Sequence, residues 1–321
     1  MPYLHLEEVT AHLQDLVVET AGLTKWYGRV RAVDNLSLRI PAGGVFGLLG
    51  PNGSGKTTTM CMLLSLVRPT SGAMRLFGQE TEGARLAALK RIGATVETPT
   101  FYPYLSGRAN LLYFQGINHR SDPGNVDRLL EMVGLSSRAG SRFSTYSLGM
   151  KQRLGIAYAL LNGPELVFLD EPTNGLDPAG MAEVRDLIRK QGSDGRTVLL
   201  SSHLLHEVEL VCDSVAILSK GRLIAQGSVR ELLKEQCSVR FKTTNDAGAV
   251  PIVSSLPWVE SVKAENGSLM ATAPPERSWE ITAALAKAGI YVSEMTQQQV
   301  SLEQYFLEVT GEDASVPVSK P

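Results

Sequence analysis

The feature that most constrains this chain is a glycine-rich segment, GPNGSGKT at residues 50–57, which fits the pattern G-x-x-x-x-G-K-[ST]. An apolar run at residues 46–50 leads into it and predicts a buried strand, while residues 58–66 after it favour a helix. Glycines let the backbone approach a phosphate chain closely, and successive N–H groups and the helix N-terminus then face the anion. A glycine-rich turn without a ligand is the alternative, but the complete motif between a strand and a helix argues against it. The sequence therefore predicts a phosphate-binding loop, or P-loop.

The side chains of this loop have separate expected parts in holding a nucleoside triphosphate. Lys56 would reach the β- and γ-phosphates, which also makes it a candidate catalytic group, and the Thr57 hydroxyl would bind Mg²⁺. The predicted nucleotide contacts in this loop are Gly50, Asn52, Gly53, Ser54, Gly55, Lys56, Thr57 and Thr58.

A second candidate site follows the apolar run at residues 166–169, which ends in Asp170 and Glu171. A buried strand that ends in Asp places a carboxylate at the edge of the sheet where open α/β folds bind their ligands. Asp170 would hold Mg²⁺ through water, and Glu171 would orient or deprotonate the attacking water. Two solvated carboxylates at the start of a loop are the alternative, which a P-loop earlier in the same chain makes less attractive.

Strand-like and helix-like segments alternate through the first two thirds of the chain. Residues 46–50, 166–169 and 197–201 are apolar on both faces, as expected of a parallel sheet that is covered by helices on each side. Helical patterns at residues 125–133 and 151–161 lie between them. The fold class that we predict is therefore α/β.

The character of the sequence changes near Cys237, where short strands replace long apolar runs. Two helical stretches separate the strands in the order βαββαβ, which suggests a small α+β module. A last helix is predicted from a capping box formed by Ser301 and Gln304. The expected strands are 238–242, 259–263, 268–272 and 290–294, and the expected helices are 246–255 and 276–288.

Composition excludes several classes of protein. The net charge of −2 gives no electrostatic footprint for nucleic acid, so no nucleic-acid partner is expected. Three cysteines without a C-x-x-C pattern argue against a disulfide framework or a zinc site. The sequence holds no apolar run near the ~18 residues of a membrane span, and residues 1–15 do not resemble a secretory signal. If this protein works at a membrane, another polypeptide must cross it.

The segment YSLGMKQR at residues 146–153 resembles the signature motif of ATP-binding cassette (ABC) proteins, usually Leu-Ser-Gly-Gly-Gln. Ser147 and Gly149 match this pattern, whereas Tyr146, Leu148 and Met150 depart from it in a way similar to the ABC-2-type drug and antibiotic exporter ATPases. Ser147 and Gly149 open a predicted helix whose N-terminus suits a phosphate group. An N-cap serine without any ligand is the plainer alternative.

The resemblance assigns roles to further residues. Asp177, in NGLD at residues 174–177, matches the D-loop, although Asp-Pro is also an ordinary helix start. His203 matches the switch histidine that contacts the γ-phosphate and would act with Glu171 in catalysis. Tyr27 resembles the aromatic residue that stacks on adenine, but it could instead pack in the core, and Trp26 could take its place.

One departure from the family concerns the expected metal site. The Q-loop position, usually glutamine, is Glu97 here, and a glutamate can also ligate Mg²⁺. Downstream, residues 101–105 read FYPYL and form an aromatic loop before the probable N-cap Ser106. This loop would dock a helix of a membrane subunit or, equally well, close the helical subdomain.

The resemblance implies a P-loop NTPase (RecA-like) ABC cassette at residues 16–236, with an inserted helical subdomain at about residues 100–165. It is weaker beyond the cassette, where a C-terminal accessory domain is expected at residues 237–310. An N-terminal extension at residues 1–15 and a tail at residues 311–321 complete the predicted organisation.

A cassette of this family would bind ATP and Mg²⁺ and hydrolyse ATP in a head-to-tail dimer, as a homodimer or with a homologous cassette. It would power export of a drug-like, antibiotic or lipid-like substrate through a separate ABC-2-type permease at the cytoplasmic face of the membrane. A regulatory or non-transport ABC ATPase is the alternative. Chromosome and DNA-repair ATPases would carry a long coiled coil or zinc-binding insertions between the P-loop and the signature. Residues 58–145 show no sustained heptad pattern and contain one cysteine, Cys61, so these classes are disfavoured. The substrate, the permease and the role of the accessory domain are not encoded in these motifs.

Overall fold

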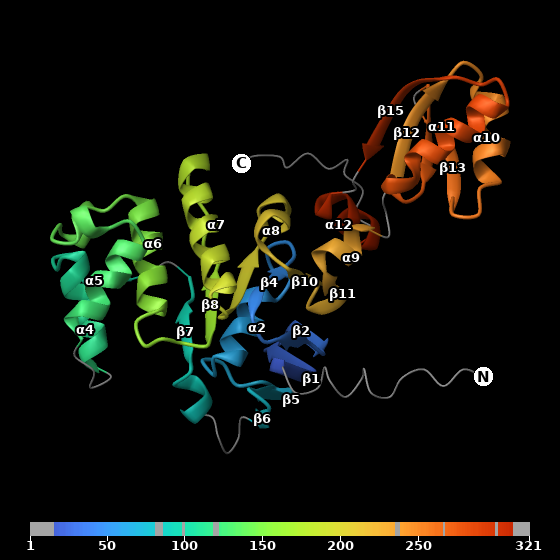
Figure 1. Ribbon diagram of the computed structural model, residues 1–321. Helices are drawn as coiled ribbons and strands as arrows, with labels where there is room; N and C mark the ends of the chain where they lie inside the picture. The colour runs from blue at the N-terminus through green and yellow to red at the C-terminus, as the bar shows by residue number, and fades with distance from the viewer. Residues whose placement is uncertain are drawn as a thin grey trace, which may run out of the picture. The chain divides into compact units, whose positions relative to one another are not determined.

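The computed structural model describes residues 16–80, 86–97, 100–117, 122–234, 238–265, 267–298 and 301–310. The predicted extension at residues 1–15 and the predicted tail at residues 311–321 therefore lie outside the described residues. The chain divides into two compact units, one up to Gln226 and one from Gly227 onward (Figure 1). The sequence placed this boundary at residue 236. Helix α9 (Val229–Lys234) lies between the two positions, and it packs on the last helix of the second unit.

The centre of the first unit is a sheet with the strand order β11-β10-β4-β9-β8-β7. Neighbouring strands from β10 to β7 are parallel, as predicted from their apolar character. Strands β8 and β9 are buried along their whole length, because helices cover both faces. The strands are β4 (Gly44–Leu49), β7 (Ile92–Thr95), β8 (Leu166–Asp170), β9 (Thr197–Ser202), β10 (Ser214–Ser219) and β11 (Arg222–Ser228).

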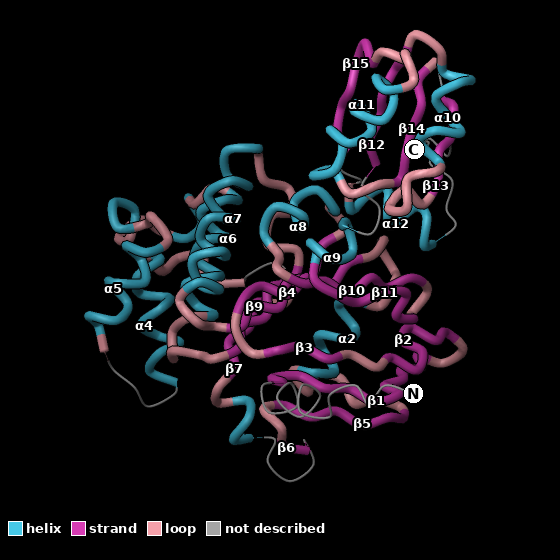
Figure 2. The backbone as a smooth tube through the Cα atoms, turned by 45° about the vertical axis from the view of Figure 1, so that its right-hand side comes forward, coloured by secondary structure: helices cyan, strands magenta, loops and turns pink. Residues whose placement is uncertain are grey.

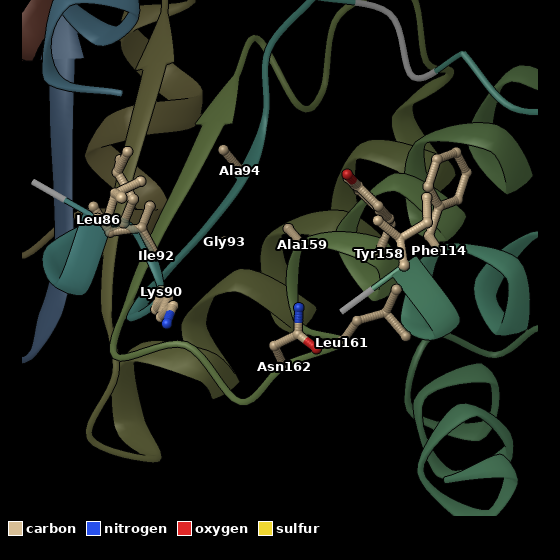
Figure 3. A pocket seen from close by; sticks show the side chains of 12 residues that line it. Leu86, Lys90, Ile92, Gly93, Ala94, Phe114, Tyr158, Ala159, Leu161 and Asn162 are labelled. Carbon is tan, nitrogen blue, oxygen red and sulfur yellow. The ribbon is translucent and has the colours of Figure 1, made fainter. Parts of the chain in front are cut away.

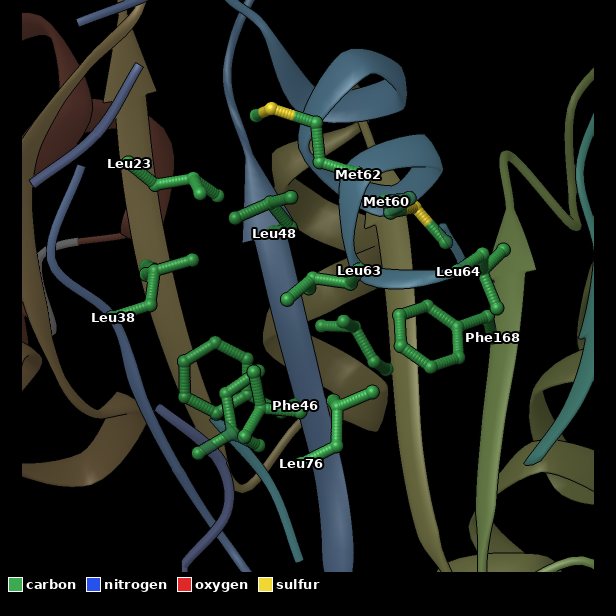
Figure 4. Close-up of a cluster of buried hydrophobic side chains, with 14 of the residues drawn as sticks. Leu23, Leu38, Phe46, Leu48, Met60, Met62, Leu63, Leu64, Leu76 and Phe168 are labelled. Carbon is green, nitrogen blue, oxygen red and sulfur yellow. The ribbon is translucent and has the colours of Figure 1, made fainter. Parts of the chain in front are cut away.

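A second, antiparallel sheet packs on the first through helix α2 (Lys56–Leu63) (Figure 2). Its strands are β1 (Leu16–Tyr27), β2 (Val30–Leu36), β3 (Arg39–Pro41), β5 (Ser71–Leu76) and β6 (Gln79–Glu80). Met60, Met62 and Leu63 of α2 are fully buried in a cluster that also contains Leu48 and Leu76 (Figure 4). Burial of each such side chain contributes about 1.5–3 kcal/mol, so this core fixes α2 and the loop before it.

Three helices gather on one side of the sheet to form the helical part of the first unit (Figure 1). They are α4 (Gly107–Ile117), α5 (Pro123–Met132) and α6 (Leu148–Ala159). The three helices contact one another, and α6 also packs on β7 and β8. Helices α7 (Pro178–Ser193) and α8 (Leu205–Val211) pack on each other and on the strands of the central sheet.

The second unit has the predicted βαββαβ order. Its strands form an antiparallel sheet in the order β13-β14-β12-β15, and buried Phe241, Leu269 and Ile281 belong to its apolar core. The predicted capping box is present, since Ser301 N donates to Gln304 and Gln304 N donates to Ser301, both at 3.2 Å. The elements are β12 (Ser238–Thr243), α10 (Asp246–Ser254), β13 (Ser261–Glu265), β14 (Ser268–Thr272), α11 (Ser278–Lys287), β15 (Val292–Gln298) and α12 (Leu302–Thr310). Of the helices that the structure describes, none is long and apolar enough to cross a membrane.

Candidate nucleotide site

The P-loop joins the end of β4 to the start of α2, as its motif requires. Gly50 and Gly55 both have positive φ angles, +149° and +102°, and neither could carry a side chain. A Cβ on Gly50 would come within 2.2 Å of the Leu218 carbonyl oxygen, and one on Gly55 within 2.6 Å of the Ala32 carbonyl oxygen. The loop is thus wedged between neighbouring strands, and only glycine fits at these two positions.

Lys56 and Ser54 face the inside of this loop. The buried Lys56 ammonium donates hydrogen bonds to the carbonyl oxygens of Gly50, at 2.8 Å, and Pro51, at 3.3 Å. The Ser54 hydroxyl is buried and has no hydrogen-bond partner among the described residues. Buried polar groups normally have partners, so an unpaired hydroxyl in a loop that also contains a buried cation marks a place suited to an anionic ligand.

Thr57 and Asp170 are brought together from opposite sides of the site. The Thr57 hydroxyl lies 3.1 and 3.2 Å from the two carboxylate oxygens of Asp170, which is only 7% exposed. Ser201 on the neighbouring strand also donates to Asp170. The register of β8 and β9 pairs Asp170 with Ser201, so the carboxylate is held from two directions.

Glu171 lies between Lys56 and His203. Its carboxylate is 2.8 Å from His203 Nδ1 through one oxygen and 3.5 Å from Lys56 Nζ through the other. The backbone of Glu171 has a φ of +48°, and its N–H donates to the Ser201 hydroxyl at 3.0 Å and to the Ser201 carbonyl oxygen at 3.2 Å. A non-glycine residue in the left-handed region needs such support, which Ser201 provides.

Ser201 was not among the predicted site residues. It lies one residue before the end of β9 and belongs to no motif, so only the register with β8 could have singled it out.

Glu97 follows β7, is exposed, and has a φ of +60°. The pKa of the Cys61 thiol in α2 is raised, mainly by burial and then by the negative charges of Asp170 and Glu97. The described residues contain no cluster of three or more His, Cys, Asp or Glu side chains that could hold a metal alone. Mg²⁺ is commonly held by one or two carboxylates together with substrate phosphates, so the pairing of Thr57 with Asp170 fits such a site.

The residues assigned to the signature and the D-loop are engaged in ordinary helix capping. Ser147 caps α6 by accepting a hydrogen bond from Met150 N at 3.3 Å, and Gly149 lies in the first turn of the same helix. Asp177 caps α7 by accepting from Gly180 N at 2.9 Å. Both capping alternatives raised by the sequence are thus present, and neither excludes a further role in another subunit's site.

Tyr27 does not pack in the core. It ends β1 with 48% of its surface exposed, and Lys25 Nζ lies 5.0 Å from its ring centroid. Trp26 is exposed as well and contacts Arg31 in a similar way. Both rings are therefore free to stack on a planar ligand.

Comparison with known proteins decides the family. A model of the ABC transporter family matches residues 33–174. The chain is 36% identical over 301 residues to the bacitracin transport ATP-binding protein BcrA of Enterococcus faecalis, covering 93% of this chain and 98% of that protein. It is 34% identical over 312 residues to the daunorubicin resistance ATP-binding protein DrrA3 of Streptomyces coeruleorubidus, covering 95% and 99%. The chain belongs to the ABC transporter family of ATP-binding proteins.

Solved structures show the same fold for this cassette. A dimeric ATP-binding cassette in a post-hydrolysis state, bound to ADP and Pi, superposes with a TM-score of 0.60 and 25% identity over 66% of this chain and 99% of that one. CbiO1 from Clostridium perfringens, part of an ABC transporter complex, gives 0.63 and 25% over 76% and 96%. The predicted family and fold class are confirmed, and the cassette is an ATPase subunit of a transporter. Cassettes of this family dimerise and work with a membrane permease.

The structure bears on one of the two alternatives that the sequence left open for the aromatic loop at residues 101–105, namely that it closes the helical part. Phe101 is 6% exposed and packs edge-on against Phe114, Phe143 and Tyr158, with centroids 5.1–5.8 Å away, so it closes the helical part. Tyr104 in the same loop is 67% exposed.

Next to this cluster lies a groove of about 640 Å³ between α4, α6 and β7 (Figure 3). Its lining is mostly apolar, includes the exposed Leu86 and Ile117, and has Lys90 as its charged residue.

Proposed function

We propose that this cassette hydrolyses ATP with Glu171 as the general base and thereby powers export through a separate ABC-2-type permease. The observation that carries the proposal is the position of Glu171, 3.5 Å from Lys56 Nζ and 2.8 Å from His203 Nδ1. A carboxylate held between a phosphate-binding lysine and a histidine can accept a proton from water that attacks a phosphate on Lys56.

When ATP binds, residues that are already in place change their hydrogen-bond partners. Lys56 turns from the carbonyl oxygens of Gly50 and Pro51 to the β- and γ-phosphates, while the P-loop N–H groups surround them. Glu171 accepts the proton of the attacking water as the oxygen–phosphorus bond to the γ-phosphate forms and the bond to ADP breaks. His203 orients Glu171 and contacts the γ-phosphate, and Tyr27 stacks on adenine.

Thr57, Asp170 and Glu97 are the residues that would hold Mg²⁺. Thr57 and Asp170 already place oxygen atoms beside each other, and Glu97 adds a second carboxylate close enough to influence Cys61. Bound Mg²⁺ would neutralise charge on the phosphates. Within the chain, Ser201 keeps the Asp170 carboxylate aimed at Thr57.

A complete site needs a second cassette. One chain has one P-loop and one signature, and Ser147 bonds within its own helix α6. In a head-to-tail dimer, Ser147 and Gly149 of one subunit would close over the phosphates on the P-loop of the other, with Asp177 beside them. Two copies of this chain are the simplest arrangement, because they bury the same surfaces twice.

The permease contact of this proposal is the groove beside α4 and α6, together with exposed Tyr104. Apolar side chains grouped around a groove are typical of an interaction surface. This contact would hold the cassette at the cytoplasmic face of the membrane. Names of relatives refer to bacitracin and daunorubicin, so a drug-like, antibiotic or lipid-like substrate is the class that we propose.

The test is Glu171→Gln. We expect the variant to bind ATP as the wild type does, to hydrolyse it about 10²–10⁴-fold more slowly, and to form an ATP-dependent dimer in size-exclusion chromatography. Unchanged steady-state ATPase activity would remove Glu171 from this role.

Co-purification from membranes in mild detergent separates the transporter from a regulatory ABC ATPase. A membrane protein that follows the chain supports the export proposal, whereas recovery without one supports the alternative.

A further inference from the structure

The departure of the signature from its usual pattern has a structural counterpart in the same chain. Leu148 stands where the usual motif has glycine, and 42% of its surface is exposed. Its Cδ2 methyl group lies over Gly175, and a Cβ built on Gly175 would come within 3.0 Å of that methyl group. The next residue along, Gly149, similarly faces Leu176, with a distance of 3.8 Å from its ideal Cβ to Leu176 Cδ2. The start of α6 thus rests on the segment that precedes α7.

This segment connects two residues of the proposed site. Gly175 lies between Glu171, which faces the P-loop of its own chain, and Asp177, which caps α7. The backbone folds back on itself here, since Asn174 N donates to the Glu171 carbonyl oxygen at 3.1 Å and Leu176 N donates to that of Thr173 at 3.3 Å. A shift of Gly175 therefore moves a short, internally bonded loop rather than one residue.

We propose that Leu148 is a positioning residue that locks the D-loop to the signature helix within one subunit. The inference rests on the proposed dimeric site and adds to it a link inside each chain. When Ser147 closes over the nucleotide of the other subunit, Leu148 carries Gly175, and with it the loop between Glu171 and Asp177. The Leu148 Cδ2 methyl group lies 3.0 Å from the position that a Gly175 Cβ would take, so little space is left for a side chain there.

A double-mutant cycle tests this link. Gly175→Ala places a methyl group against Leu148 Cδ2, and Leu148→Ala removes the isopropyl group that carries Cδ2. The double variant therefore has the new methyl group at residue 175 without the group that it would contact. Because Gly175 has a φ of +74°, alanine there also strains the backbone. This strain is present in the single and the double variant alike, so it cancels in the cycle.

A matched control exists at Gly195. It has a φ of +86°, and a Cβ there would meet nothing within 4 Å. Gly195→Ala therefore reports the cost of backbone strain alone, and its effects should multiply with those of Leu148→Ala without any coupling.

We expect Gly175→Ala to lower kcat while leaving the dissociation constant for ATP on the isolated subunit nearly unchanged. Adding Leu148→Ala should raise kcat again by relieving the contact but not the backbone strain, with a coupling factor of at least about threefold, as found for side chains in contact. In the chain without nucleotide, the double variant should unfold at a higher temperature than Gly175→Ala alone. The thermal measurement tests the contact itself and does not depend on dimer formation.

Two results would overturn the inference. One is a double variant whose kcat and unfolding temperature are the simple combination of the single effects, as at Gly195. The other is a rescued unfolding temperature without rescue of kcat, which would leave a packing contact with no positioning role. Neither result would affect the assignment of Glu171, which the Glu171→Gln variant tests separately.

Discussion

The two halves of the proposed ATP site differ in how much of each one chain builds by itself. Side chains from three regions of the first unit meet in one half. Thr57 contacts Asp170, and Glu171 contacts both Lys56 and His203. The Ser147 and Asp177 side chains, by contrast, cap the first turns of their own helices. In the proposed function, the first half would carry out the chemistry within one chain, whereas the two helix starts of the second half would meet a ligand bound to another subunit. Nucleotide binding and nucleotide hydrolysis should therefore be separable by mutation.

Lys56→Ala should have the largest effect, because it removes the buried cation from the half that one chain builds. We expect both ATP binding and ATPase activity to be lost, with activity falling by at least about 10²-fold, as when a charge-stabilising donor is removed. Binding of a fluorescent ATP analogue to the monomer and steady-state phosphate release check the two effects. Retention of wild-type affinity would break the comparison, since the first half would then not depend on its cation.

Ser147→Asp distinguishes capping from phosphate contact in the other half. Aspartate is as good an N-cap as serine, so the melting temperature should not fall. Its charge would oppose a phosphate from the partner subunit, and we expect ATPase activity to drop about tenfold or more while the monomer still binds ATP. Ser147→Ala is the control, since it removes the cap at a cost of about 1 kcal/mol without adding charge. Normal activity in Ser147→Asp would mean that Ser147 is an N-cap and nothing more.

Ser201→Ala should have the smallest effect of the three. It removes a hydrogen bond to Asp170 and one that supports the Glu171 backbone, while a water molecule can replace part of each. Each such bond contributes about 0.5–1.5 kcal/mol and water replaces part of it, so kcat should fall by about fivefold with little change in ATP affinity. Single-turnover hydrolysis with a parallel binding titration makes this measurement. A loss of affinity equal to the loss of kcat would place Ser201 in binding rather than in hydrolysis.

Much of this fold could be predicted from sequence, because its signals are local. Several features depend on neighbours within a few residues. They are the apolar runs that form β8 and β9, the P-loop between a strand and a helix, and the Ser301–Gln304 capping box. The βαββαβ order of the second unit followed from the same kind of pattern, although β13 and β15 begin two residues later than predicted, at Ser261 and Val292.

The features that escaped prediction depend on contacts between distant segments. Ser201 supports Asp170 across a strand register, and the Leu148–Gly175 contact joins segments that no periodicity relates. Phe101 and Tyr104 are neighbours in one loop, yet one is buried and the other exposed, which depends on where α4 and α6 pack. The roles of the individual site residues remain predictions that the variants above test.

The hydrogen bonds of Lys56 to Gly50 and Pro51 have a consequence for repeated turnover. A lysine that already has acceptors gains from a phosphate only the difference between two sets of partners. Losing each hydrogen bond to a carbonyl oxygen costs about 0.5–1.5 kcal/mol, and the net free energy of phosphate binding is smaller by that amount. In the proposed site, these carbonyl oxygens would compete with the phosphates for Lys56, which would moderate ATP affinity and favour departure of the products. An ATPase that must release its products in every catalytic cycle benefits more from such an exchange of partners than from the highest possible affinity.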